Sequence, residues 1–202
     1  MARGSHTDDI ILLRCCGDDI YPYLDAAARL RIEVFRDYPY LYEGTFTYER
    51  DYLEHYVSCP DSIFVCAMDR EDVVGISTAI PLVAADVAFQ KPFLDADQPI
   101  QGIFYLGESV LLPQYRGRGI GHAFFDHREA QAKKLGCHAA TFCSVIRPDN
   151  HRLKPHGYRS NESFWDKRGY QRNGLRADFP WSEVYEQGIT SHEMEFWSRR
   201  LE

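Results

Sequence analysis

The chain has 202 residues, is 45% hydrophobic and carries a formal net charge of −7, so we expect one ordinary folded domain and exclude a disordered chain. The acidic balance argues against nucleic acid as the main partner, because neutralising phosphates requires a basic surface. No apolar run approaches about 18 residues, so we expect no membrane partner, and no secretory signal is visible at the start.

Residues 1–8 are predicted to be a tail or an expression remnant, and residues 9–202 a single domain. Within it, apolar residues recur with a helical period in two segments, and apolar runs bounded by turn residues indicate strands. The predicted elements of the first half are a strand at 9–14, helices at 21–35 and 47–57, and strands at 62–68 and 72–81.

The second half predicts a connection with one short helix, followed by alternating strands and helices. The segments are the connection at 81–99, a strand at 103–112, a helix from 120 to 135, a strand at 139–146, a short helix at 161–169 and a strand at 191–201. In the long helix we expect an ion pair between Glu129 and Lys133, four residues apart. Its apolar stripe comprises Ile120, Ala123, Phe124, His127 and Ala130. The order indicates an α+β fold around one sheet.

The six cysteines include no C-x-x-C pair. Cys66 and Cys143 lie inside apolar runs and are predicted to be small core residues. This usage fits a reducing, cytoplasmic location. No histidine pair has the spacing of a helical zinc site, so we expect no metal.

The stretch "YRGRGIG", Tyr115 to Gly121, places three glycines between an apolar strand and a helix. Glycine permits left-handed backbone and close approach, and a helix N-terminus attracts anions, so the stretch predicts a pyrophosphate site. The dinucleotide fingerprint fails because its third glycine would be His122. The Walker pattern fails because no G-K-[ST] follows.

The stretch matches the pattern [Q/R]-x-x-G-x-[G/A] with Arg116, Gly119 and Gly121. This is the acyl-CoA pyrophosphate loop of the GNAT superfamily of N-acetyltransferases, which the sequence resembles. "ESVLLPQYRGRGIG" has the strand, link and loop in the family's order, "FWDKRGY" resembles the end of the family's fourth helix, and "RIEVF" resembles its first helix.

The resemblance implies a mixed, mostly antiparallel seven-stranded sheet flanked by about four helices. The sheet would splay open between its fourth and fifth strands, here 103–112 and 139–145. The pantetheine arm of acetyl-CoA, the cosubstrate, would pair with the backbone at Val110 and Leu112. The other residues predicted to bind it are Leu111, Arg116, Gly117, Arg118, Gly119, Ile120, Gly121 and Trp165.

The implied reaction moves an acetyl group from the thioester to a primary amine. Glu108 lies in the splayed strand, where the resemblance implies an acidic residue, and is the candidate general base. It could instead be a surface carboxylate or a partner of Arg116. The candidate acceptor contacts in the connection between the first two helices are Tyr40, Tyr42 and Glu43.

Many enzymes of the resembling family carry a tyrosine that protonates the departing sulfur, but here that position is Trp165. An indole can donate a hydrogen bond but cannot supply a proton. Tyr158 and Tyr170 are the candidate replacements. The departing thiol has a pKa of about 8.5, so it also leaves as a tolerable thiolate.

The sequence therefore predicts an acetyl-CoA-dependent N-acetyltransferase. A catalytically weakened CoA-binding sensor or interaction module is the alternative, because of Trp165. A small-molecule or peptide amine is the expected acceptor, and its identity, like the presence of a homodimer, stays open.

Overall fold

The computed structural model describes residues 10–202, so the predicted tail (1–8) and Asp9 of the predicted first strand lie outside it. The strands are β1 (Ile11–Cys15), β2 (Ile63–Asp69), β3 (Asp72–Pro81), β4 (Ile103–Leu111), β5 (Ala139–Val145), β6 (Gln171–Ser182) and β7 (Ile189–Arg200). The α-helices are α1 (Leu24–Phe35), α2 (Phe46–Val57), α3 (Val87–Asp95), α4 (Ile120–Lys134) and α5 (Glu162–Lys167).

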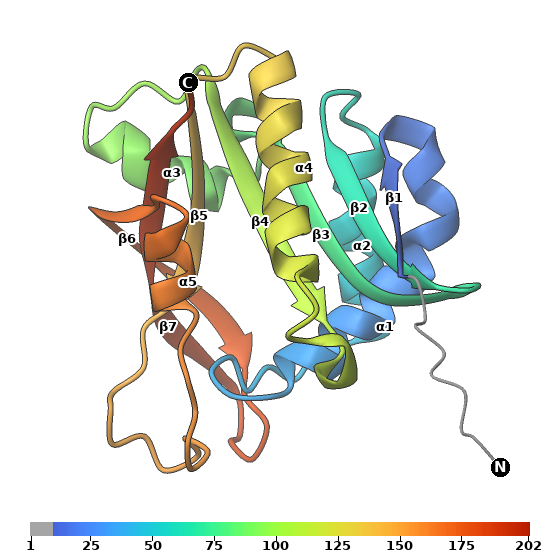
Figure 1. Cartoon of the computed structure of the whole chain (residues 1–202). Coiled ribbons are helices and arrows are strands. Elements are labelled where there is room, and N and C mark those ends of the chain that lie inside the picture. Colours follow the sequence, from blue (N-terminus) through green and yellow to red (C-terminus); the bar gives the residue numbers. More distant parts are fainter. Residues whose placement is uncertain (1–9) are drawn as a thin grey trace, which may run out of the picture.

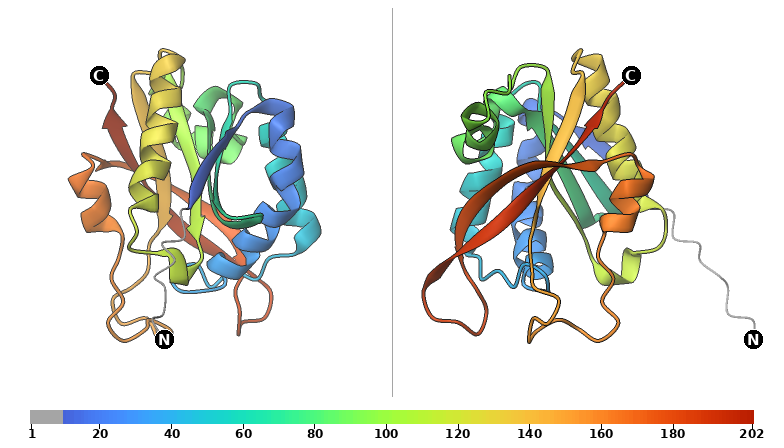
Figure 2. Two further views of the ribbon diagram at one scale, coloured as in Figure 1. Left: turned by 45° about the vertical axis from the view of Figure 1, so that its right-hand side comes forward. Right: turned by 90° about the vertical axis from the view of Figure 1, so that its left-hand side faces the viewer.

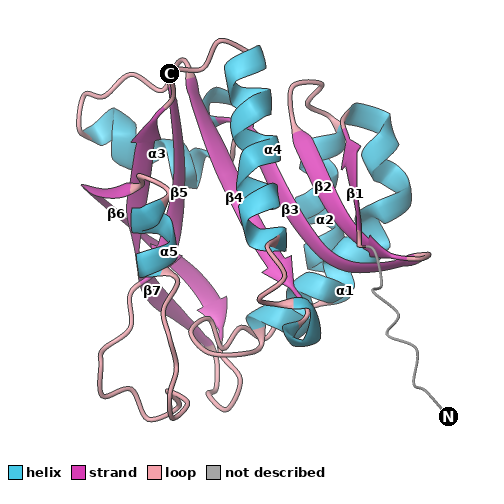
Figure 3. Cartoon of the chain, in the orientation of Figure 1, coloured by secondary structure: helices cyan, strands magenta, loops and turns pink. Residues whose placement is uncertain are grey.

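All seven strands form one sheet in the order β1-β2-β3-β4-β5-β7-β6. Neighbouring strands are antiparallel except β4 and β5, which are parallel. Helices α4 and α5 cover one face, and α1, α2 and α3 cover the other (Figures 1 and 2). Figure 3 shows the mixture of helices and strands that makes this an α+β fold. The seven-stranded mixed sheet is confirmed, with five α-helices rather than about four.

Strands β4 and β5 pair along only three residues, Ile103–Tyr105 with Ala139–Thr141. Beyond that point β4 continues beside β3, and β5 continues beside β7. The two strands therefore separate toward their carboxyl ends, as predicted, and leave an opening in the middle of the sheet (Figure 1).

The central strands bury both of their faces, which explains their continuous apolar runs. Residues 63–67 are all fully buried. On the face of α1, α2 and α3 the core includes Leu53, Phe93 and Phe196, and on the face of α4 it includes Phe124 and Trp197. Cys66 and Cys143 are buried in the first of these cores, which confirms their predicted placement.

Helix α4 buries only part of the stripe that its apolar residues predict, namely Ile120 and Phe124. Arg128 and Glu129 are buried, whereas Ala130 is exposed. The predicted Glu129–Lys133 pair is wrong, because Glu129 bonds to groups outside the helix. Its partners are the guanidinium groups of Arg168 and Arg199 and the hydroxyl of Tyr170. Periodicity alone could not predict a face that is set by these buried contacts.

Strand β6 is absent from the elements that the sequence patterns predict, although the family resemblance implied a seventh strand. Its residues alternate between exposed and partly buried, and it has glycine at position 174 and proline at 180. Such residues are typical of an edge strand with an irregularity, and β6 lies at the sheet edge with a register shift between Arg172 and Arg176. None of the helices within residues 10–202 is long and apolar enough to cross a membrane.

Candidate active site

The glycine-rich loop joins the end of β4 to the start of α4, beside the opening between β4 and β5 (Figure 1). Gly117 and Gly119 have φ values of +77° and +82°, in the left-handed region that favours glycine. Gly119 is the N-cap of α4, and no side chain caps the helix there. The first turn of α4 therefore presents backbone N–H groups that a ligand can satisfy.

Backbone conformation explains glycine at positions 117 and 119 but not at Gly121, because the φ of Gly121 is not positive. A Cβ built there would meet only Phe164, with its Cζ at 3.7 Å, an ordinary contact. The fold therefore does not require glycine at this position. Because Gly121 has no side chain, a ligand can approach the backbone of the first turn of α4 closely.

Arg116 and Arg118 are both exposed on this loop. The Nε of Arg116 donates to the carbonyl of Leu111 at 3.3 Å, and Arg118 lies over the ring of Tyr115 at 5.2 Å. Arg118 also donates to the carbonyl of Gln114 at 3.1 Å. Two cations are thus placed beside an uncapped helix N-terminus.

The backbone of β4 corrects one part of the predicted pantetheine contact. The N–H of Leu112 donates to the Val74 carbonyl at 3.0 Å, so it is already used by the β3 side of the sheet. Backbone groups alternate in direction along a strand, so Val110 also points toward β3, while Leu111 points toward the opening. Leu111 is therefore the better candidate for pairing with an extended ligand.

A β-bulge places Glu108 on the face of α1 and α2. Two residues, Gly107 and Glu108, oppose the single residue Thr78 of β3. Before the bulge Tyr105 faces the α1–α2 core, and after it Val110 does so too, five residues later. Strict alternation would put these two side chains on opposite faces, so the bulge reverses the pattern and directs Glu108 toward α1.

Gly107 is required by the packing around this bulge. A Cβ at position 107 would lie 2.3 Å from the hydroxyl oxygen of Tyr56 and 2.5 Å from the Oγ1 of Thr78. Both distances are far below any real contact of a Cβ. The tyrosine hydroxyl therefore occupies the space beside the Gly107 backbone, two residues past the last pair between β4 and β5.

Glu108 is buried, with 3% of its side chain exposed, and is paired with Arg31 of α1. Its Oε2 lies 2.5 Å from the Nη1 of Arg31, which also contacts Glu49 through its Nε. The Oε1 of Glu108 has no hydrogen-bond partner among the described residues. Burial raises the pKa of the Glu108 carboxyl above its ordinary value, although the Arg31 charge acts in the opposite direction. Glu108 is thus neither a surface carboxylate nor a partner of Arg116.

Arg128 approaches the same bulge from the α4 face. Its guanidinium donates to the carbonyls of Thr78 and Glu108 at 3.3 and 3.2 Å and to the hydroxyl of Ser109 at 2.8 Å. Burial lowers its pKa to about 10. Arg128 therefore holds the irregular backbone in place and leaves the Glu108 carboxylate to the other face.

The three aromatic residues predicted near the leaving group lie in different environments. Tyr170 is fully buried and donates to Glu129 at 3.0 Å, so its selection as a candidate acid is wrong. Tyr158 packs edge-on against Tyr38, with the ring centroids 4.7 Å apart. Burial raises the pKa of Tyr158, and the Arg116 charge acts in the opposite direction. Trp165 is partly buried, with ring centroids 4.9 Å from Phe142 and 5.2 Å from Trp197.

Of the three candidate acceptor contacts, Tyr42 touches the Glu108 cluster directly. Tyr42 donates its hydroxyl to Glu49, which links the connection between α1 and α2 to Arg31. Tyr40 packs against Phe35 at 4.6 Å, and its carbonyl accepts from Arg147 at 2.9 Å. Glu43 is exposed, and its N–H donates to the Ser182 carbonyl at 2.8 Å.

Several residues of this site were not predicted from the sequence, namely Arg31, Glu49, Tyr56 and Arg128. For Glu49 a signal existed, because it shares a helical face with Leu53 and Tyr56 at i, i+4 and i+7, and all three are buried. Arg31 and Arg128 gave no such signal, because a buried arginine cannot be told from a solvated one by spacing. Within residues 10–202 no cluster of His, Cys, Asp or Glu could hold a metal ion.

The sequence matches the model of the acetyltransferase (GNAT) family over residues 27–155, more than half of the chain. That range contains most of α1, the β4 bulge and the whole glycine-rich loop. None of the curated proteins gives a significant match.

Several solved structures share the fold at low sequence identity. A ribosomal-protein-alanine N-acetyltransferase from Brucella melitensis has a TM-score of 0.62 at 11% identity, over 95% of this chain and 99% of its own. A GCN5-related N-acetyltransferase from Kribbella flavida has a TM-score of 0.56 at 18% identity, over 94% and 98%. The protein yncA of Salmonella typhimurium, solved with its cofactor acetyl-CoA, has a TM-score of 0.58 at 11% identity, over 95% and 94%.

Proposed function

The chain belongs to the acetyltransferase (GNAT) family, and we propose that it transfers an acetyl group from acetyl-CoA to a primary amine. The observation that carries this proposal is the buried Glu108 carboxylate beside the opening between β4 and β5, with one oxygen that has no partner among the described residues. An amine that loses a proton in this opening has an acceptor for it.

The residues around the opening fit acetyl-CoA as cosubstrate. The pyrophosphate would contact the N–H groups of the loop and the first turn of α4, where Gly121 leaves room and Arg116 and Arg118 supply positive charge. The backbone of Leu111 would pair with the pantetheine arm as an added strand. The bound cosubstrate supplies the acetyl thioester on which the amine acts.

Glu108 would act on the acceptor rather than on the thioester. A lysine-like amine has a pKa of about 10.4, so its free base costs about 4.6 kcal/mol at pH 7. Glu108 would accept the proton that the nitrogen loses as it bonds to the acetyl carbon, and CoA would leave as its thiolate when the carbon–sulfur bond breaks. The raised pKa of Glu108 makes it a stronger base than an ordinary carboxylate.

Leaving-group protonation is expected to contribute little, and Trp165→Tyr tests this. Tyrosine restores the acid typical of the family but loses indole contacts with Phe142 and Trp197. We expect kcat to change by less than about tenfold and the free energy of unfolding to fall by about 1 kcal/mol. Steady-state kinetics and thermal melts measure both. A tenfold gain in kcat would show instead that sulfur protonation limits the rate.

Gly121→Val tests the acetyl-CoA site. Acetyl-CoA at about 100 times its Kd stabilises a folded protein by about 2.7 kcal/mol, so the wild-type melting temperature should rise by about 5–10 °C. The valine side chain should remove most of this shift, because the free fold has room for it but the phosphate then does not. Ala130→Val, an exposed position of the same helix, is the matched control. Equal shifts in both variants would contradict the site.

A further inference from the structure

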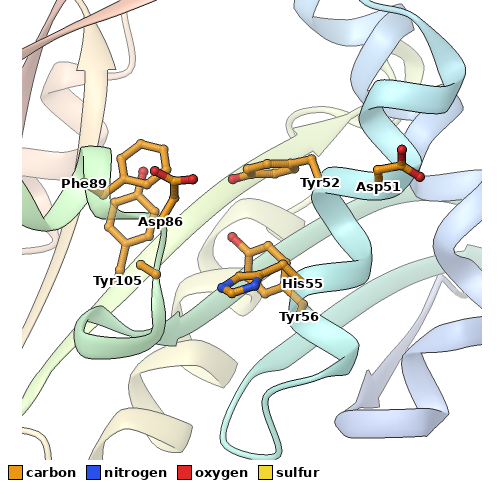
Figure 4. Close-up of a pocket in the computed structure, with 8 residues that line it drawn as sticks. Asp51, Tyr52, His55, Tyr56, Asp86, Phe89 and Tyr105 are labelled. Atoms are coloured by element: carbon orange, nitrogen blue, oxygen red, sulfur yellow. The ribbon is translucent and has the colours of Figure 1, made fainter.

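A pocket of about 230 Å³ lies on the face of α1, α2 and α3, between α2 and the β3–β4 connection (residues 82–102). Figure 4 shows Tyr52, His55 and Tyr56 of α2 facing Asp86 and Phe89 of that connection. Tyr105 of β4 contributes a further ring. No part of the glycine-rich loop lines this pocket, so it is separate from the proposed CoA site.

The pocket combines aromatic walls with negative charge. Four of its lining residues are aromatic, two are aspartates, Asp51 and Asp86, and none is lysine or arginine. Phe89 is stacked on Tyr105 with a centroid distance of 4.5 Å, which fixes two of the rings. His55 donates to the Ala84 carbonyl at 2.6 Å, which ties α2 to the connection. Aromatic faces and carboxylates together favour an alkylammonium group.

The pocket shares a wall with the Glu108 cluster. The Tyr56 hydroxyl lies beside the backbone of Gly107, and the Tyr52 ring lies under the Arg31 guanidinium at 4.4 Å. In that cluster Arg31 faces two carboxylates, Glu49 and Glu108, while Arg128 contacts the Glu108 carbonyl from the other face of the sheet. The Glu108 carboxylate and the acidic aromatic pocket therefore lie on either side of the Tyr52–Tyr56 wall.

We propose that the pocket holds a second positively charged group of the acceptor, so that the natural acceptor is a diamine or a comparable dication. One amine lies at Glu108 and is acetylated, and the other lies between the rings near Asp86. This inference rests on the proposed acetyltransferase function. On this proposal the β3–β4 connection selects which acceptor binds.

The test compares α,ω-diaminoalkanes of increasing chain length with n-alkylamines of the same lengths, titrated into the protein loaded with CoA. For the best chain length we expect the diamine to bind about tenfold more tightly than its monoamine. Asp86→Asn should remove most of this preference. Asparagine still caps α3, where the Asp86 Oδ1 accepts from Ala88 at 2.8 Å, so the helix is retained. Phe89→Leu should weaken diamine binding and leave monoamine binding unchanged.

Asp95→Asn is the matched control, because it removes the same charge from an exposed position of the same helix. It should keep the full preference for the diamine. Equal affinities for diamine and monoamine, an unchanged preference in Asp86→Asn, or no amine binding to protein that binds CoA would overturn the inference alone. Failure to bind CoA in the first titration would overturn the proposed function, and the inference with it.

Discussion

Arg31→Met is expected to lower the free energy of unfolding by about 3–5 kcal/mol, the largest stability effect that we predict for a single substitution. Methionine keeps much of the aliphatic stem but removes the guanidinium that pairs with both Glu49 and Glu108. Both carboxylates are almost completely buried, so neither can be solvated in its place. Denaturant titration at neutral pH measures the loss.

Two comparisons isolate the charge effect in Arg31→Met. Arg50→Met removes a partly exposed arginine of α2 that pairs with the exposed Asp25 at 3.1 Å, and should cost less than about 1 kcal/mol. The cost of Arg31→Met should shrink as the pH falls through the raised pKa of Glu108, because protonation removes the unpaired charge. A cost equal to that of Arg50→Met, or independent of pH, would contradict this account of the cluster.

Glu108→Gln is expected to lower kcat by about 10²-fold, a typical contribution of a general base. Glutamine keeps the shape of the side chain, and the KM for acetyl-CoA should stay close to the wild-type value. Glu33→Gln, an exposed position of α1, is the control for removal of a negative charge. An unchanged kcat in Glu108→Gln would remove Glu108 from the mechanism.

The pH dependence gives a second test of the same residue. Burial raises the pKa of Glu108, so the wild-type rate should increase as the pH rises through a value above that of an ordinary carboxyl group. This increase of the rate with pH should be absent in Glu108→Gln. The difference between the two enzymes should also shrink at high pH, where the acceptor amine deprotonates without help.

The fold could be predicted largely from the sequence because its signals are local. The apolar run of β3 spans 72–81, as predicted, and the strand–loop–helix around Arg116 is specified by glycines and a following helical period. Strand β6 gave no such signal, because an edge strand with half-buried residues lacks a continuous apolar run. The burial of Arg128 on α4 was also missed, because it depends on carbonyls from two distant strands.

The candidate site could be predicted only in part. Glu108 was identified from its place in the strand, but its direction depends on a bulge that no periodicity shows. Its partner Arg31 is 77 positions away in the printed sequence and comes close only through the packing of α1 on the sheet. The pocket between α2 and the β3–β4 connection likewise needs three segments that are brought together only by the fold.

The most direct test of the central claim is a mass-spectrometric assay of product formation. Wild type and Glu108→Gln are incubated with acetyl-CoA and a panel of alkylamines, diaminoalkanes and peptides, and free CoA thiol and acetylated amine are quantified together. We expect equimolar thiol and acetylated amine from the wild type, about 10²-fold faster than from Glu108→Gln. Acetyl-CoA binding without any acetylated amine would contradict the proposal and identify the chain as a CoA-binding module.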